Sequence, residues 1–141
     1  MARIDPKIAR LAQLPLFEGC STKELLEIGA HLDEVALPAG ATLTHEGAIE
    51  PQAFLLASGR AEVRAHGVVV AELSGGELVG EISLLDRTRS RTATVTALTP
   101  VVAFVLTPRD LASILNLSPV VAERVHREWA RRAAALETLA S

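Results

Sequence analysis

Turn signals divide the middle of this 141-residue chain into short segments, and this division restricts the fold more than any other feature. Between residues 32 and 106 the segments are rich in β-branched or alternating apolar residues, such as Val35, Leu43, Val63 and Val95. Segments of this kind, bounded by Gly, Pro and Ser, predict the short strands of a sandwich or barrel. The turn signals are Pro38-Ala39-Gly40, Glu46-Gly47, Ser58-Gly59, His66-Gly67, Ser74-Gly75-Gly76 and Leu98-Thr99-Pro100.

Two helices are predicted before the strands. Residues 5–14 open with an aspartate and a proline, which together can cap and begin a short helix, and Pro15 should end it. Ser21 and Glu24 form the pattern of a capping box, which predicts a second helix to about His31. We expect that helix to bury its apolar residues Leu25, Leu26 and Ile28.

Two further helices are predicted after the strands. Thr107, Pro108 and Asp110 combine a cap, a proline and an acid in one turn, so a helix should cover about 108–116. Ser118 and Pro119 restart the chain as a longer helix to about Leu139, with apolar residues at steps of three or four. This apolar stripe consists of Val121, Val125, Trp129, Ala133 and Leu136.

The long last helix carries residues that bear on partners. Spacing typical of a helical core favours packing or a dimer contact for Trp129 over stacking on a ligand base. A stripe that ends in Leu136 needs a neighbour, so we also predict a homodimer through residues 120–139. Four arginines are interleaved with glutamates, so we interpret them as a solvated face rather than a nucleic-acid surface. They are Arg124, Arg127, Arg131 and Arg132.

A length of 141 residues predicts one domain, over residues 1–141. Helices in 1–31, strands in 32–106 and helices in 107–141 predict the α+β class for it. A net charge of −3 provides no basic field for nucleic acid or anionic membrane. The single cysteine, Cys20, excludes an internal disulfide framework and indicates a reducing compartment. The start lacks the apolar core of a signal peptide and no apolar run approaches about 20 residues, so we expect a cytoplasmic location.

Chemistry concentrates in residues 75–95. Gly80 has no Cβ, so backbone can approach a ligand closely there. A short helical turn over 81–85 would leave free amides that suit a phosphate, and Arg91 offers a bidentate guanidinium. Ser83 and Thr92 can add hydroxyl donors. Glu81 would repel a bare anion, so the ligand should also carry a hydroxyl, and phosphate plus hydroxyl indicates a nucleotide.

The stretch Gly80-Glu81-Ile82-Ser83-Leu84-Leu85, followed by Arg91-Thr92-Ala93-Thr94-Val95, resembles the phosphate-binding cassette of the cyclic nucleotide-binding domain family. The ten-residue step from Glu81 to Arg91 is similar to that of the bacterial catabolite activator protein. Segments 16–25, 38–47 and 54–63 resemble other parts of the same family. The resemblance implies a jelly-roll-like antiparallel β-roll of about eight strands, with a short cassette helix, N-terminal helices and a long C-terminal helix.

The resemblance also implies residue roles. Glu81 would accept the ribose 2′-hydroxyl, Arg91 would pair with the cyclic phosphate, and Thr92 would touch the phosphate or base edge. Amides near Ile82 and Ser83 would complete the cradle. The ligand would be cAMP or, as a second option, cGMP. The full predicted ligand set is Val79, Gly80, Glu81, Ile82, Ser83, Arg91, Thr92 and Ala93, with no catalytic residue and no metal ligand.

Other functions find less support in the sequence. The four histidines and Cys20 form no cluster with metal-ligand spacing, and no nucleophile motif of the Gly-x-Ser-x-Gly type appears. We therefore predict a sensor and not an enzyme, with no cofactor beyond its ligand. No helix-turn-helix follows the long helix before Ser141, so specific DNA binding is not expected. Two alternatives stay open: a fragment of a larger regulator, or an interaction domain that has lost its nucleotide.

Overall fold

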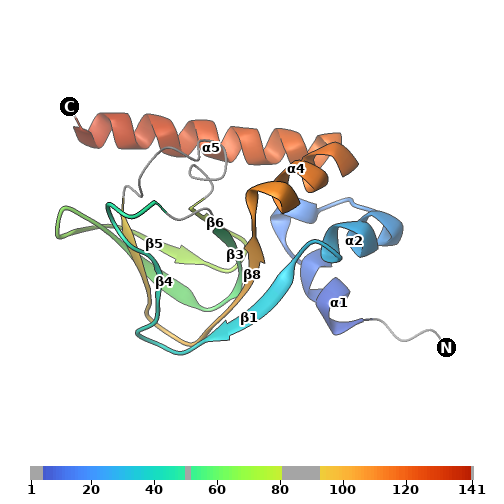
Figure 1. Cartoon of the computed structure of the whole chain (residues 1–141), viewed down its shortest axis with the longest axis horizontal. Coiled ribbons are helices and arrows are strands. Elements are labelled where there is room, and N and C mark those ends of the chain that lie inside the picture. The colour runs from blue at the N-terminus through green and yellow to red at the C-terminus, as the bar shows by residue number, and fades with distance from the viewer. Residues whose placement is uncertain (1–4, 50–51, 81–92, 141) are drawn as a thin grey trace.

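A computed structural model describes residues 5–49, 52–80 and 93–140, which form two antiparallel sheets and flanking helices. The helices that precede the strands are α1 (Pro6–Ala12), the 3-10 helix η1 (Pro15–Phe17) and α2 (Thr22–Gly29). The helices that follow them are α4 (Pro108–Leu117) and α5 (Pro119–Ala140). In Figure 1, α1, α2 and α4 gather at one end of the strands, and α5 runs along one side of the roll.

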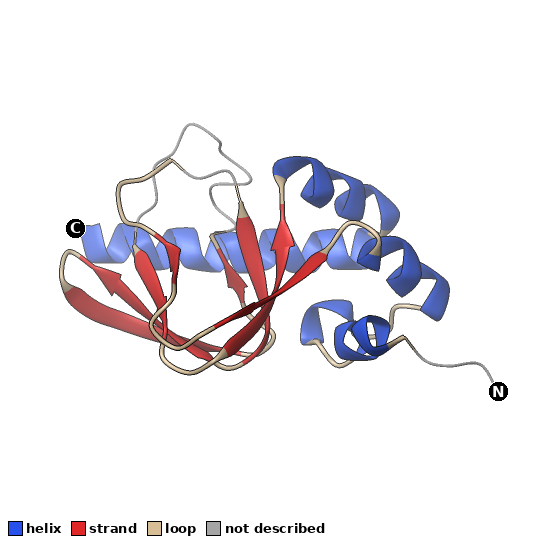
Figure 2. Cartoon of the chain, turned by 60° about the horizontal axis from the view of Figure 1, so that its bottom comes forward, coloured by secondary structure: helices blue, strands red, loops and turns tan. Residues whose placement is uncertain are grey.

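The described residues contain eight strands, as predicted. Sheet 1 has the order β1-β8-β3-β6 and sheet 2 the order β2-β7-β4-β5. Figure 2 shows both sheets with α5 behind them. The predicted α+β β-roll of about eight strands is thus confirmed. The strands are β1 (Asp33–Leu37), β2 (Thr42–Thr44), β3 (Ala53–Ser58), β4 (Arg60–Ala65), β5 (Val68–Ser74), β6 (Leu78–Val79), β7 (Thr94–Ala97) and β8 (Val101–Leu106).

Local signals set the helix starts. The Asp5 carboxylate accepts from the Lys7 amide at 2.8 Å, and Ser21 and Thr107 both begin complete capping boxes. These arrangements satisfy amides that have no intrahelical partner. One expectation for α2 is wrong, because Leu26 is 53% exposed whereas Leu25 and Ile28 are buried. Leu26 lies on the side of α2 that the other helices do not cover.

Alternation along the strands of sheet 1 creates two apolar cores. On β3, Leu55 belongs to a helical core that also contains Phe104 of β8 and residues of every helix. Its neighbour Leu56 belongs to an inter-sheet core, shared with sheet 2. The residues that sheet 2 contributes to these two cores all belong to the inter-sheet core: Leu43, Ala61, Leu73, Val95 and Ala97. The two inner strands of sheet 1, β3 and β8, are therefore buried on both faces, whereas the edge strand β1 is largely exposed.

The chain crosses between the sheets at Gly59. This glycine has φ +91°, and a Cβ there would lie 2.4 Å from the Pro100 carbonyl oxygen. Only glycine combines that backbone conformation with such a close approach. The predicted turn signal at Ser58-Gly59 therefore marks the point at which β3 of sheet 1 passes into β4 of sheet 2.

Candidate functional site

The described chain reaches the predicted cassette through β6. Val79 is 1% exposed, pairs with Phe54 of β3 and packs in the inter-sheet core. Gly80 follows with φ +79°, in the left-handed region that favours glycine. The sequence argument for Gly80 was its missing Cβ, and the backbone conformation supplies a second reason for glycine at this position.

The described chain leaves the cassette through β7, which lies between β2 and β4 in sheet 2. The hydroxyl of Thr44, a side chain that is 2% exposed, donates to the Ala93 carbonyl at 3.1 Å. The Glu46 amide donates to Thr94 Oγ1 at 3.0 Å. Val95 packs in the same inter-sheet core as Val79. A single core thus joins the strands on either side of the cassette.

Five of the predicted ligand residues, Glu81, Ile82, Ser83, Arg91 and Thr92, lie outside the described residues, and so does the predicted cassette helix. The other three, Val79, Gly80 and Ala93, belong to the segments that lead into and out of it. Their roles as ligand residues stay predictions. The contacts of Thr44 and Glu46 with this region were not predicted, because neither a threonine hydroxyl at the end of a strand nor a backbone amide in a turn has a distinguishing sequence signal.

Helix α5 lies beside the roll and is anchored at its start. Val121 and Val125 are 0% and 1% exposed and belong to the helical core. Trp129, one turn further on, is half-buried, as a packing role predicts. Its indole Nε1 is buried, and no acceptor for it occurs in the part of the chain that the structure describes. Intramolecular packing therefore accounts for the first half of the predicted stripe.

Arg124 corrects the interpretation of the α5 arginines as a solvated face. Its Nη1 donates to the carbonyl oxygens of Pro15, Leu16 and Glu18, at 3.3, 3.0 and 2.8 Å. The carbonyls of Leu16 and Glu18 lie at the end of η1, where backbone acceptors commonly lack helical partners, and the Pro15 carbonyl also accepts from the Glu18 amide at 3.2 Å. Arg127 does lie on an exposed face, where it pairs with Glu123 at 2.7 Å. One arginine thus fastens α5 to the N-terminal segment.

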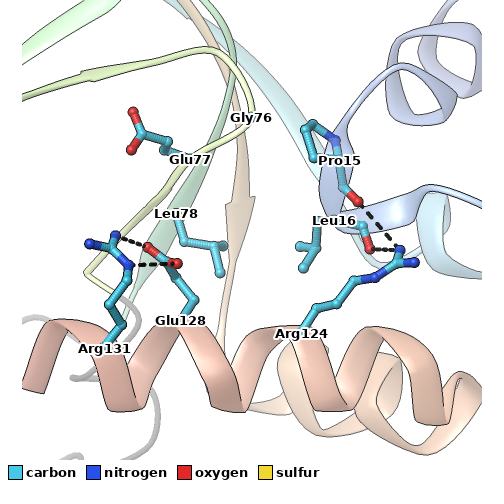
Figure 3. A pocket seen from close by; sticks show the side chains of 8 residues that line it. All are labelled: Pro15, Leu16, Gly76, Glu77, Leu78, Arg124, Glu128 and Arg131. Atoms are coloured by element: carbon cyan, nitrogen blue, oxygen red, sulfur yellow. Dashed lines mark hydrogen bonds and ion pairs between the residues drawn. The ribbon is translucent and has the colours of Figure 1, made fainter.

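A cavity of about 250 Å³ lies between α5, η1 and the turn from β5 to β6 (Figure 3). Leu16 and Leu78 face each other across it, and Arg124 and the Glu128–Arg131 ion pair border its α5 side. None of the described residues that we assign to the ligand, Val79, Gly80 and Ala93, lines this cavity. Its lining residues are Pro15, Leu16, Gly76, Glu77, Leu78, Arg124, Glu128 and Arg131.

Alternative chemistry finds no site in the described residues. They contain no group of three His, Cys, Asp or Glu side chains that could hold a metal ion. Burial raises the pKa of the Cys20 thiol, and the Glu24 carboxylate raises it further. Arg124 and a hydrogen bond with Ser118 oppose this rise, but the net direction favours the unreactive thiol over the thiolate. The described helices also include none with the length and apolar character needed to span a bilayer.

Known proteins resemble this chain over most of its length. A cyclic nucleotide-gated potassium channel of Rhizobium etli is 32% identical over 117 residues, which cover 83% of this chain and 32% of the channel. The acetyltransferase Pat of Mycolicibacterium smegmatis is 34% identical over 139 residues, or 95% of this chain and 41% of the enzyme. The chain therefore spans less than half the length of these two curated relatives.

Solved structures give the same result. The crystal structure of Thermus thermophilus catabolite activator protein matches with a TM-score of 0.76 at 28% identity, over 88% of this chain and 60% of that one. The family model described as "cyclic nucleotide-binding domain" matches residues 34–118, more than half of the chain. That range includes the whole stretch from Val79 to Ala93, with the described strands on both sides of it. The chain belongs to the cyclic nucleotide-binding domain family.

Proposed function

We propose that this domain binds a cyclic nucleoside monophosphate, with cAMP as the first candidate, and that it relays occupancy through α5. The observation that carries the proposal is the family match over residues 34–118, which contains the predicted cassette. The left-handed Gly80 directly before Glu81 supports it, because the cassette pattern requires glycine there. cGMP is the second candidate, since Thr92 is compatible with either base.

In this proposal Arg91 binds the cyclic phosphate and Glu81 accepts the ribose 2′-hydroxyl. Amides near Ile82 and Ser83 complete the phosphate cradle. Val79 and Ala93 hold the two ends of the cassette against sheets 1 and 2. The two charged groups thus bind different parts of the ligand. The Arg91 guanidinium pairs with the phosphate, and the Glu81 carboxylate accepts a hydrogen bond from the hydroxyl.

The relay would use the unequal anchoring of α5. Val121, Val125 and Arg124 fix its first turns to the helical core and to η1. Beyond them, Trp129 is half-buried and its indole nitrogen is buried without a described acceptor. We propose that nucleotide shifts this later part of the helix, which requires that it bind the two helix positions with different affinity.

The domain is regulatory in this proposal and performs no reaction itself. Its place in a longer protein would decide the output, since one relative is an acetyltransferase of more than twice the matched length. A cytoplasmic location follows from the same proposal, because cyclic nucleotides of this class act inside the cell. We propose no DNA contact by this domain, whose formal net charge is −3.

Calorimetric titration with cAMP and with cGMP tests the ligand. The parent chain should bind one of them saturably, and Arg91→Ala should weaken that binding by at least about tenfold, or ~1.5 kcal/mol. Arg87→Ala is the matched control, because Arg87 lies in the same segment but outside the cassette register. It should bind within about twofold of the parent.

The outcomes separate the alternatives. No heat with either nucleotide, from a parent chain that unfolds cooperatively, would contradict the proposal and favour a nucleotide-free interaction domain. Equal loss in Arg91→Ala and Arg87→Ala would contradict the assignment of Arg91 as the phosphate ligand.

We also propose a homodimer through α5, but with a different contact face from the predicted apolar stripe. Val121 and Val125 pack within the chain, so a partner would meet Val120, which is 51% exposed, and the exposed Ala130. Light scattering after size exclusion measures the mass directly. A monomeric mass at about 100 μM, with and without nucleotide, would remove dimerisation from the proposal.

A further inference from the structure

One loop residue connects the end of the cassette to a distant hairpin. Glu46 lies in the turn after β2, where the Ala48 amide donates to the His45 carbonyl at 3.1 Å. Its own amide donates to Thr94 Oγ1 at 3.0 Å, at the start of β7. The Glu46 backbone therefore holds Thr94, the second described residue after the segment 81–92.

The carboxylate of Glu46 contacts a different segment, the turn between β4 and β5. Its Oε1 accepts from the His66 amide at 3.0 Å, and the His66 imidazole Nδ1 lies 3.6 Å from the same oxygen. His66 has φ +52° and lies in the two-residue turn beyond the last pair of the β4–β5 ladder, Ala65 with Val68. Its amide therefore needs an acceptor from outside the ladder.

The two contacts of Glu46 meet in sheet 2. Strand β7 lies between β2 and β4, and Thr94 pairs with Arg64 near the end of β4. Thr94 is thus paired with a strand of the β4–β5 hairpin, whose tip donates a hydrogen bond to the Glu46 carboxylate. The Thr94 hydroxyl also accepts a hydrogen bond from the Glu46 amide. Thr44 adds a third restraint through the Ala93 carbonyl, but it comes from β2 alone.

We propose that Glu46 is a positioning residue for nucleotide binding. By tying the β4–β5 hairpin tip to the turn after β2, it fixes where Ala93 and Thr94 continue from the cassette. This inference rests on the proposed function, in which Arg91 and Thr92, the residues immediately before Ala93, bind the ligand. A side chain that is 32% exposed and touches no ligand would then control affinity.

Substitutions separate the hydrogen bond from the charge. Glu46→Ala removes the acceptor for the His66 amide and should weaken cAMP binding three- to tenfold. Glu46→Gln keeps an acceptor oxygen and loses the charge, so it should bind within about twofold of the parent. Glu72→Ala is the matched control, because Glu72 is an exposed carboxylate of the same sheet that pairs with Arg60. It should also bind within twofold.

A second variant and a second measurement distinguish lost positioning from a general loss of stability. Thr94→Val removes the oxygen that accepts from the Glu46 amide while keeping the side-chain volume, and it should weaken binding to a similar degree. Amide hydrogen exchange reads the positioning without any nucleotide. Exchange at His66 and at the Thr94–Val95 amides should accelerate at least threefold in Glu46→Ala and remain near the parent rate in Glu46→Gln.

The results distinguish this inference from the proposed function. If the parent binds cAMP and Glu46→Ala binds equally well, the positioning role is wrong while the sensor function stands. If the parent binds no cyclic nucleotide, the proposed function fails. Unchanged exchange at Thr94 in Glu46→Ala would then overturn the positioning role as well. Equal weakening in Glu46→Ala and Glu72→Ala would also overturn it, because any lost carboxylate would then suffice.

Discussion

Sheet 1 and sheet 2 are both antiparallel and four-stranded, but their surroundings differ. Sheet 1 packs on the helical core with one face and on the inter-sheet core with the other, so that Leu55 and Leu56 are both 0% exposed. Sheet 2 contributes described residues to the inter-sheet core only, and Val68 and Val69 of its last strand are 62% and 50% exposed. The two sheets therefore carry very different amounts of buried apolar area.

From this difference we expect sheet 1 to contribute most to stability, whereas the proposed ligand contacts adjoin sheet 2. Burial of apolar side chains is the main favourable term in folding, and most of the buried apolar residues belong to sheet 1 and to the helices that pack on it. Sheet 2 contains β7, which continues from the predicted cassette, and its polar contact with the Glu46 amide is exposed, whereas that with Thr44 is partly buried. Regions of this kind can adjust at small cost to the whole fold.

The largest expected effect is in sheet 1. Phe104→Ala would leave a cavity at a fully buried position of the helical core. It should lower the free energy of unfolding by about 3–5 kcal/mol, measured by urea denaturation. Phe104→Leu keeps more volume and gives a smaller loss if the alanine variant does not fold. A loss below about 1 kcal/mol for Phe104→Ala would contradict the assignment of stability to sheet 1.

An intermediate effect is expected where α5 meets η1. Arg124→Ala removes a charged donor from three carbonyls, so we expect a loss of about 1–2 kcal/mol, discounted for the partial exposure of the side chain. Arg127→Ala is the control on the same helix, because its ion pair with Glu123 is largely solvated. That control should cost no more than about 0.5 kcal/mol. Equal losses would show that Arg124 acts as an ordinary surface arginine.

The smallest effect is expected on β5. Val69→Thr keeps a β-branched side chain on a half-exposed strand at the edge of sheet 2, so stability should change by less than about 0.5 kcal/mol. Thermal unfolding followed by circular dichroism measures the change. A loss above 1 kcal/mol would mean that this strand is buried in solution, for example by a second molecule, and would narrow the contrast between the sheets.

Features that depend on neighbouring residues in the chain could be predicted from the sequence. The capping boxes at Ser21 and Thr107 were recognised because a cap involves residues only three positions apart. The turn at Gly59 was recognised because positive φ restricts the residue type, and Gly80 was singled out because it has no Cβ. The family resemblance then supplied the β-roll of about eight strands, whose pairing local patterns do not contain.

Features that depend on the packing of distant segments could not be predicted. Leu26 was expected inside because it is apolar, but the exposure of one side of α2 follows from where the other helices lie. Arg124 was interpreted as solvated because its partners are backbone carbonyls more than 100 positions away. The contacts of Glu46 were not predicted for the same reason, because Thr94 begins β7 and His66 lies in the turn after β4.

The pairing of β1 with β8 joins Asp33 to Val105. During synthesis, sheet 1 therefore cannot close until the chain has been made as far as β8, whereas the β4–β5 hairpin needs only the residues around its two-residue turn. Contacts between distant parts of a chain form slowly, because a long loop must first be closed. The β4–β5 hairpin can therefore form before sheet 1 closes, and α4 and α5 follow directly after β8, the strand that completes sheet 1.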